Sequence, residues 1–168
     1  MSNVIWVDEK DNILGEIPRE KAHREGLLHR ISVIYLINEK GEILVNLRAK
    51  DGHLDHSSAG HVDVGETYLE AAKRELNEEL GVSGTELLDI GGSAAATDID
   101  GDLKSNHMMQ IYATTAKPIN INHEEVKMIF WQNPKEALKD MSINPKKYTN
   151  GFKSSIKIIL DYLNKSKK

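Results

Sequence analysis

The chain has 168 residues, a formal net charge of −4 and a sequence pI near 6.0. This length is typical of one domain, here residues 1–168, that buries its own core, and the acidic balance argues against stable nucleic-acid binding. No cysteine is present, which excludes disulfides, thiolate ligands and a thiol nucleophile. We also find neither a membrane-spanning apolar run nor a secretory leader, and therefore expect a cytoplasmic protein.

The N-terminal half alternates short apolar segments with turn residues, a pattern typical of strands joined in hairpins. This pattern predicts strands at residues 4–7, 13–17, 31–37 and 43–47. Pro18 suits the first turn of a short helix at residues 18–24. Residues 50–58 are rich in Asp, His and Ser, and we interpret them as a polar loop.

The C-terminal half predicts further strands at residues 85–97, 107–115 and 126–131, with a turn at residues 98–102. Pro134 opens a helix that extends to about Asp140. A closing helix at residues 150–164 is amphipathic, and its inward-facing residues are Phe152, Ile156, Ile159, Leu160 and Leu163. Strands interleaved with helices imply an α/β (α+β) fold with a mixed sheet between helical layers.

A further helix is predicted between Thr67 and Gly81. Thr67 and Glu70 form a capping box at its start, and Gly81 suits the left-handed position that ends a helix. At 100° per residue, an apolar stripe on this helix must face a core. The stripe consists of Leu69, Ala72, Leu76 and Leu80.

Glu75, Glu78 and Glu79 form a second stripe on the same helix. Glu75 and Glu79 are like charges one turn apart, which is mildly destabilising unless a cation lies between them. Carboxylate oxygens suit Mg²⁺ or Mn²⁺. For the stripe alone, the alternative is a solvated face with a salt-bridge ladder of Glu70, Arg74 and Glu78.

The glutamates belong to a longer pattern of fixed spacing. The residues 60–82 fit G-x5-E-x7-R-E-U-x-E-E-x-G-U, with U aliphatic, at all nine specified positions. A chance match in a chain of this length is on the order of one in ten million. The pattern resembles the Nudix box, and the order of predicted elements is similar to the Nudix fold from about residue 3 to residue 163.

The resemblance implies an α/β/α sandwich around a mixed sheet, with an N-terminal β-hairpin extension and short helix within residues 1–28. It implies Mg²⁺, with Mn²⁺ as a substitute, as the cofactor. The implied metal ligands are Glu75, Glu78, Glu79 and the carbonyl of Gly60. Glu66 and Arg74 are implied to form a structural ion pair that braces the loop against the helix.

The sequence does not decide which of several glutamates acts as the general base. Glu75 or Glu78 could act through a water at the metal, and Glu124 or Glu125 could act from the loop before the strand at 126–131. Arg48 and Lys50 are candidates for phosphate contacts because they end the strand that enters the polar loop. Ordinary solvated charges are the alternative interpretation of these two residues.

Within the superfamily, residues 21–30 and 55–61 and the N-terminal hairpin resemble the isopentenyl-diphosphate-isomerase-like branch. That isomerase protonates an alkene with a cysteine placed directly before the Gly-His that begins the box. This chain has Ala59 at that position. Because alanine can neither donate nor accept a proton, we expect no isomerase activity.

The isomerase also holds a metal with three histidines and with two glutamates that flank an asparagine. His23, His29 and His61 match the histidines, whereas residues 105–107 read Ser-Asn-His and lack both glutamates. The three histidines are therefore either a second metal site or hydrogen-bonded structural residues.

We therefore expect a Mg²⁺-dependent Nudix pyrophosphohydrolase that cleaves the diphosphate bond of a nucleoside diphosphate derivative by water attack on phosphorus. The alternatives are an isopentenyl-diphosphate-isomerase-like enzyme and a non-catalytic Nudix-fold binding module, against which the complete acidic stripe argues. The expected partner is a small-molecule diphosphate, with no nucleic acid or membrane. The sequence selects neither the substrate nor the oligomeric state, and a homodimer through the N-terminal hairpin or a sheet edge stays open.

Overall fold

The computed structural model describes residues 2–166, except for the side chains of residues 92–95. The strands are β1 (Asn3–Val7), β2 (Ile13–Pro18), β3 (His29–Leu36), β4 (Ile43–Arg48), β5 (Leu54–Asp55), β6 (Ser58–His61), β7 (Leu88–Asp100), β8 (Leu103–Thr114) and β9 (Val126–Gln132). The helices are α1 (Arg19–Glu25), α2 (Tyr68–Leu80), α3 (Pro134–Ile143) and α4 (Asn150–Ser166), with a 3-10 turn at Pro145–Lys147. The predicted mixed α+β fold is confirmed.

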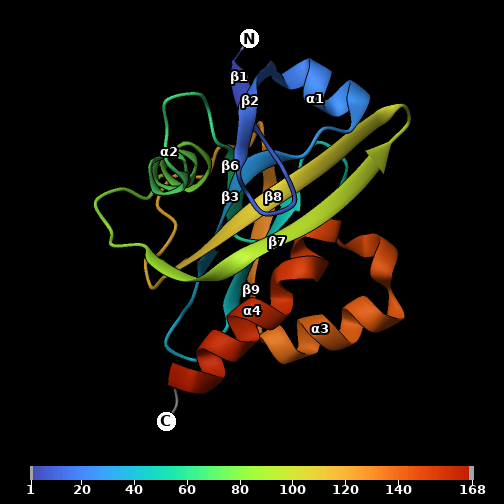
Figure 1. Ribbon diagram of the computed structural model, residues 1–168. Coiled ribbons are helices and arrows are strands. Elements are labelled where there is room, and N and C mark those ends of the chain that lie inside the picture. Colours follow the sequence, from blue (N-terminus) through green and yellow to red (C-terminus); the bar gives the residue numbers. More distant parts are fainter. Residues whose placement is uncertain (1, 167–168) are drawn as a thin grey trace.

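The strands form two sheets. The larger has the order β2-β1-β3-β8-β7, with β6 also paired to β3, and the smaller has the order β5-β4-β9. β3 and β8 run parallel, whereas β3 and β6 run antiparallel. β3 therefore lies at the centre of the fold, and Figure 1 shows α2 on one side of it and α3 and α4 on the other.

Alternation along β3 divides the core into two layers. Val33 and Tyr35 pack with Phe152 and other residues of α4. Ile34 and the next alternate residue, Leu36, face the opposite way and pack against α2. Each such fully buried side chain contributes roughly 1.5–3 kcal/mol of hydrophobic stabilisation, so these layers hold both helices against the sheet.

Both predicted ends of α2 are confirmed. Thr67 Oγ1 accepts a hydrogen bond from the Glu70 amide at 3.1 Å, and Gly81 ends the helix with a φ of 68°. Three residues of the apolar stripe are buried, but Leu69 is 37% exposed, so the prediction was wrong there. The buried face is rotated toward Ala71 and Glu79, which leaves Leu69 at its margin.

Two predicted loops contain more strand than expected. The β7–β8 hairpin stays paired through Asp100 and Leu103, which confines its turn to Gly101 and Asp102 instead of residues 98–102. The polar segment at residues 50–58 contains β5 and the first residue of β6. Both segments pair through their backbones, so they do not need the apolar side chains that a sequence pattern detects.

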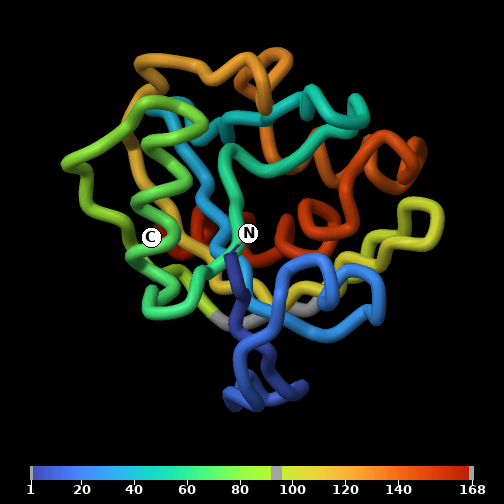
Figure 2. The backbone as a smooth tube through the Cα atoms, turned by 90° about the horizontal axis from the view of Figure 1, so that it is seen from above, coloured from blue at the N-terminus to red at the C-terminus, as the bar shows by residue number. Residues whose placement is uncertain are grey.

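The N-terminal hairpin β1–β2 is present and extends away from the rest of the chain (Figure 2). α1 follows it and lies beside β8. The sequence ends in a basic segment, residues 165–168, whose last two lysines lie outside the described residues. No helix among the described residues is long and apolar enough to cross a membrane.

Candidate active site

Three carboxylates converge beside the C-terminal half of α2. Glu75, Glu79 and Glu125 each place one carboxylate oxygen within 4.8 Å of the others. The two helical residues meet because they are one turn apart on the same face. Glu125 comes from the loop that precedes β9, so helical geometry does not account for its position next to Glu75 and Glu79.

The loop before β9 is tied to the end of α2 by backbone hydrogen bonds. The amides of Ile119 and Asn120 donate to the Leu80 carbonyl at 3.0 and 3.1 Å, and the Asn122 amide donates to the Glu79 carbonyl at 3.0 Å. These bonds satisfy carbonyls that a helix end leaves without a partner. They also bring the exposed Glu125 to the helical glutamates.

Glu79 is the most buried carboxylate of the cluster, with 8% exposure. Its Oε1 accepts a hydrogen bond from Ser58 Oγ at 2.8 Å and one from the Ala59 amide at 3.1 Å. Burial raises the pKa of Glu79 to about 8, with repulsion from Glu75 adding to it, although both hydrogen bonds act in the opposite direction.

Glu75 lies between this buried carboxylate and the guanidinium of Arg74. Burial raises the pKa of Glu75 to about 7, and repulsion from Glu78 and Glu125 acts in the same direction. The hydrogen bond from Arg74 Nη1, at 2.7 Å, lowers the pKa but does not offset burial. One guanidinium therefore does not neutralise the cluster, and the oxygen donors suit a divalent cation such as Mg²⁺ or Mn²⁺.

Gly60 is required by the close approach of Glu75 to β6. A Cβ atom at residue 60 would lie 2.0 Å from Glu75 Cδ and 2.3 Å from its Oε1. Because a Cβ atom cannot lie this close to another heavy atom, any side chain at residue 60 would force the Glu75 carboxylate to move. The first glycine of the box thus makes room for its glutamates.

Arg74 connects α2 to the loop that precedes it. Its Nε and Nη2 each donate to one oxygen of Glu66 at 2.8 Å, a bidentate pair, and Nη2 also donates to the His61 carbonyl at 3.0 Å. The hydrogen bonds from Arg74 lower the pKa of Glu66. Glu70 forms no ion pair with Arg74 in the described part of the chain, whereas Glu78 lies 3.5 Å from it, so the alternative salt-bridge ladder does not include Glu70.

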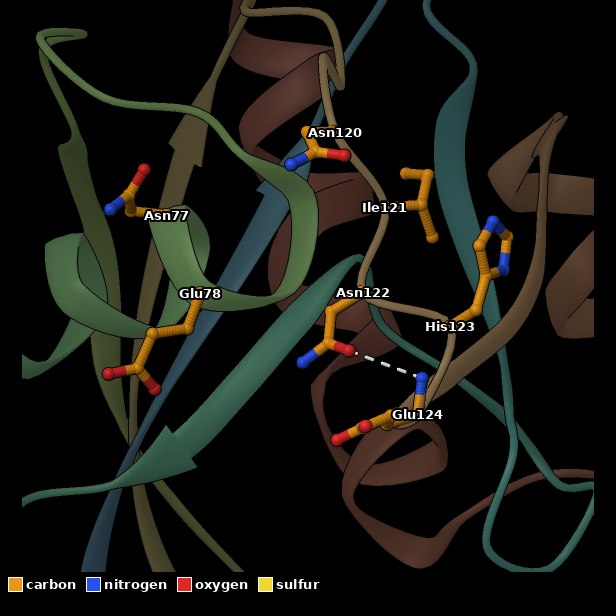
Figure 3. Close-up of a pocket in the computed structure, with 7 residues that line it drawn as sticks. All are labelled: Asn77, Glu78, Asn120, Ile121, Asn122, His123 and Glu124. Atoms are coloured by element: carbon orange, nitrogen blue, oxygen red, sulfur yellow. Dashed lines mark hydrogen bonds between the residues drawn. The ribbon is translucent and has the colours of Figure 1, made fainter.

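Glu78 stands apart from the other carboxylates of the box. Its side chain is 51% exposed, and its nearest described cation is Arg74 Nη1 at 3.5 Å. It lines an open pocket of about 580 Å³, together with Asn77, Asn120, Ile121, Asn122, His123 and Glu124. Figure 3 shows Glu78 and Asn77 of α2 across from the loop that carries Asn122 and Glu124.

The asparagines of this pocket were not predicted from the sequence. Asn77, Asn120 and Asn122 carry no spacing signal because they come from a helix and a loop distant in sequence. The Asn122 side chain accepts a hydrogen bond from the Glu124 amide at 3.2 Å, which shapes the loop (Figure 3). The one available signal was the concentration of polar residues directly before Glu125.

Arg48 and Lys50 lie at the same edge of the molecule as Glu125. The Ala49 amide, between them, donates to the Glu125 carbonyl at 3.0 Å. Arg48 Nη2 also forms an ion pair with Asp51 at 3.0 Å, and Lys50 is exposed. The backbone at these two residues therefore lies beside the backbone at Glu125, and part of the Arg48 charge is neutralised by Asp51.

The structure gathers the three matched histidines and adds a fourth. His23, His29, His61 and His107 each place one ring nitrogen within 4.8 Å of the others. Burial lowers the pKa of His29 to about 4 and holds the pKa values of His61 and His107 well below their ordinary value. These rings are therefore neutral at physiological pH, and they share no residue with the carboxylate cluster.

The raised pKa values give a testable pH dependence. Glu79 binds a proton in the folded state at a pH where the unfolded chain has released it, so the free energy of unfolding falls as pH rises through about 8. We expect metal-free protein to melt at a lower temperature at about pH 9 than at about pH 7.5, above the ordinary range of histidine titration. Calorimetry should show that Mg²⁺ reduces this fall. A Glu79→Gln variant with the same fall would contradict the assignment to Glu79.

Removal of the Arg74 guanidinium should lower the stability of the protein as well as its hydrolytic activity. Arg74→Ala leaves Glu66 and Glu75 without their cation, which we expect to cost about 1–3 kcal/mol given the partial exposure of the pair. Chemical denaturation measures this cost, with the exposed Lys73→Ala on the same helix as the control. An unchanged stability in Arg74→Ala would mean that Arg74 does not brace the loop.

Comparisons with known proteins agree with this geometry. A family model described as the NUDIX domain matches residues 27–152. The chain is 31% identical over 161 residues to an isopentenyl-diphosphate Delta-isomerase of Serratia proteamaculans, covering 92% of this chain and 89% of the relative. It is 32% identical over 138 residues to an uncharacterised Nudix hydrolase of Yersinia pestis, covering 77% and 72%.

A solved structure from Deinococcus radiodurans superimposes with a TM-score of 0.72 at 24% identity, covering 92% of this chain and 97% of that one. This likeness supports the fold, and the relatives confirm the predicted resemblance to both Nudix hydrolases and isopentenyl-diphosphate-isomerase-like proteins. Because the matched family model spans most of the sequence, including the whole box, the chain belongs to the Nudix family.

Proposed function

We propose that this chain is a Mg²⁺-dependent hydrolase that cleaves the diphosphate bond of a nucleoside diphosphate derivative. The observation that supports this most is the convergence of Glu75, Glu79 and Glu125. Burial raises the pKa values of the two helical members, so their ionised forms are costly in the folded chain unless a bound cation stabilises them. Nudix enzymes generally use divalent metals, and this cluster offers the oxygen ligands that such a metal requires.

Glu75 and Glu79 would hold the cation, with the Gly60 carbonyl beside them and Glu78 at the rim. When bound, Mg²⁺ or Mn²⁺ would neutralise diphosphate oxygens and polarise the attacking water. Ser58 and the Ala59 amide fix the Glu79 carboxylate through their two hydrogen bonds. Fixed ligands of this kind keep the site in one geometry while the substrate reacts.

Glu125 is our candidate for the general base. It is exposed, carried by a loop, and within reach of the helical carboxylates, so it could accept a proton from water that attacks phosphorus. Glu75 and Glu78 stay as alternatives for this role. Arg48 and Lys50, at the same edge, would bind the phosphate oxygens that lie beyond the cation.

The pocket beside Glu78 is our candidate for the nucleoside side of the substrate. Asn77, Asn120 and Asn122 place amide groups around it, and each amide can both donate and accept hydrogen bonds. Such groups suit the polar edges of a nucleobase or a ribose. The pocket is open, which is consistent with a substrate whose second group extends into solvent.

An isomerase is the second candidate because a relative with that name aligns over most of the chain. The residues at the positions of the isomerase site argue against isomerase activity. Ala59 has no proton to transfer, and its backbone amide is already bonded to Glu79. Ser105 and His107 stand where the isomerase-type site has carboxylates, so two further groups differ.

Glu79→Gln should lower kcat by at least about a hundredfold, because it removes a ligand charge while keeping the side-chain shape. The kcat values of the wild type and the variant would be measured for hydrolysis of a panel of nucleoside diphosphates, nucleotide sugars and dinucleotides with Mg²⁺ or Mn²⁺. The exposed Glu70→Gln on the same helix is the control, and its activity should be unchanged. Turnover in Glu79→Gln within about threefold of the wild type would refute the ligand assignment.

Neither the wild type nor Ala59→Cys should interconvert isopentenyl and dimethylallyl diphosphate. The restored thiol supplies one proton-transfer group, but the carboxylates missing at Ser105 and His107 remain missing. Proton NMR of the two diphosphates checks this, with hydrolysis of the panel substrate as the control for active protein. Isomerisation by the wild type would overturn the proposed hydrolase, and an inactive wild type on every substrate would favour a binding module.

A further inference from the structure

Four histidines from four separate elements meet beside the larger sheet. His23 comes from α1, His29 from β3, His61 from β6 and His107 from β8. Parallel pairing of β3 with β8 places His29 directly opposite His107, and their ring centroids are 4.7 Å apart. The His29 and His61 rings stack, with an interplanar angle of 3° and centroids 5.1 Å apart. The cluster is thus created by the tertiary fold.

Two of the buried rings have a nitrogen that contacts no hydrogen-bond partner in the described chain. His29 is fully buried, and its Nδ1 lies 2.8 Å from the Leu27 carbonyl. A carbonyl only accepts, so Nδ1 carries the proton and Nε2 carries the lone pair. His29 Nε2 and His107 Nε2 are both buried without a hydrogen-bond partner among the described residues. Buried polar atoms are rarely left in this state unless a ligand satisfies them.

The spacing of the ring nitrogens matches metal coordination. His23 Nε2 and His61 Nε2 are 3.2 Å apart. Zinc–nitrogen bonds of about 2.0–2.1 Å in a tetrahedron place neighbouring nitrogens about 3.3–3.4 Å apart. The most distant pair of ligand atoms lies within 4.8 Å, so closing the tetrahedron requires a shift of about 1.5 Å at most between two rings.

We propose that His23, His29, His61 and His107 form a closed structural site for a divalent transition metal of the zinc class. Four neutral imidazoles suit Zn²⁺ and its neighbours, and they do not suit Mg²⁺, which prefers oxygen ligands. Four protein ligands leave no open position for a substrate or a reactive water, which is the mark of a structural site. The ion would attach α1 to β3, β6 and β8.

The surroundings support a site of this kind. The Leu27 carbonyl orients His29 and increases the basicity of its free nitrogen, the usual role of a hydrogen-bond partner behind a metal ligand. Burial lowers the pKa values of His29, His61 and His107, which favours the neutral form of the ring that binds a metal. The ring of His61 belongs to the histidine cluster, and its carbonyl accepts a hydrogen bond from Arg74 at 3.0 Å. The histidine cluster therefore lies next to the carboxylate cluster but shares no ligand residue with it.

Zinc binding to the full chain tests the proposal, with millimolar Mg²⁺ present to occupy oxygen-donor sites. We expect one Zn²⁺ per chain by elemental analysis and a higher melting temperature than for chelator-treated protein. His107→Leu and His29→Gln should each weaken Zn²⁺ binding by at least about a hundredfold. The exposed His123→Gln is the matched control, and Glu79→Gln should also bind Zn²⁺ like the wild type.

A second measurement on the wild type keeps the result independent of variant folding. Co²⁺ in place of Zn²⁺ should give the intense visible absorption of a tetrahedral ion, and X-ray absorption of the zinc form should show four nitrogen ligands. Absence of zinc binding by the wild type would overturn the proposal. An octahedral cobalt spectrum, or full zinc affinity in His107→Leu, would do so too. Loss of Mg²⁺-dependent turnover after zinc removal from a still-folded protein would contradict the structural role.

Discussion

The attachment of α2 to β6 through a buried carboxylate is the interaction on which the candidate active site depends. Glu79 lies on the same buried face as Leu76 and Leu80, and its only polar partners on β6 are Ser58 and the Ala59 amide. A buried carboxylate with two hydrogen bonds still costs free energy, as its raised pKa indicates. The apolar layer around the helix outweighs that cost, so stability supplied elsewhere keeps the carboxylate in place.

Arg74 performs the complementary task at the solvent side of the helix. One planar guanidinium binds Glu66 with two hydrogen bonds, the His61 carbonyl with a third and Glu75 with a fourth. Lysine could not reproduce this arrangement, because a single ammonium lacks the planar fork. The loop from His61 to Glu66 and the carboxylate of Glu75 therefore adopt one arrangement together, and this explains the fixed spacing between those residues in the sequence.

Features that depend on neighbouring residues could be predicted from the sequence, whereas clusters of residues from distant segments could not. The caps of α2 and the joint stripe of Glu75 and Glu79 follow from helical geometry, and the structure contains them. His107 joins its cluster only because β3 and β8 pair in parallel in one register, which no local pattern encodes. Glu125 remained one of several candidates for the same reason, since backbone bonds to α2 decide its position.

The short strand β6 separates the carboxylate cluster from the histidine cluster, which are the two proposed cation sites. Its successive residues alternate between faces, so Ser58 and Gly60 serve the carboxylates while the ring of His61 turns to the other histidines. Oxygen donors on one side suit a hard cation such as Mg²⁺, and nitrogen donors on the other suit a transition metal, so the two proposed sites differ in the ion that they favour. A metal held at His61 would also fix the carbonyl that Arg74 contacts, and stability gained in the histidine cluster would reach α2 through that one hydrogen bond.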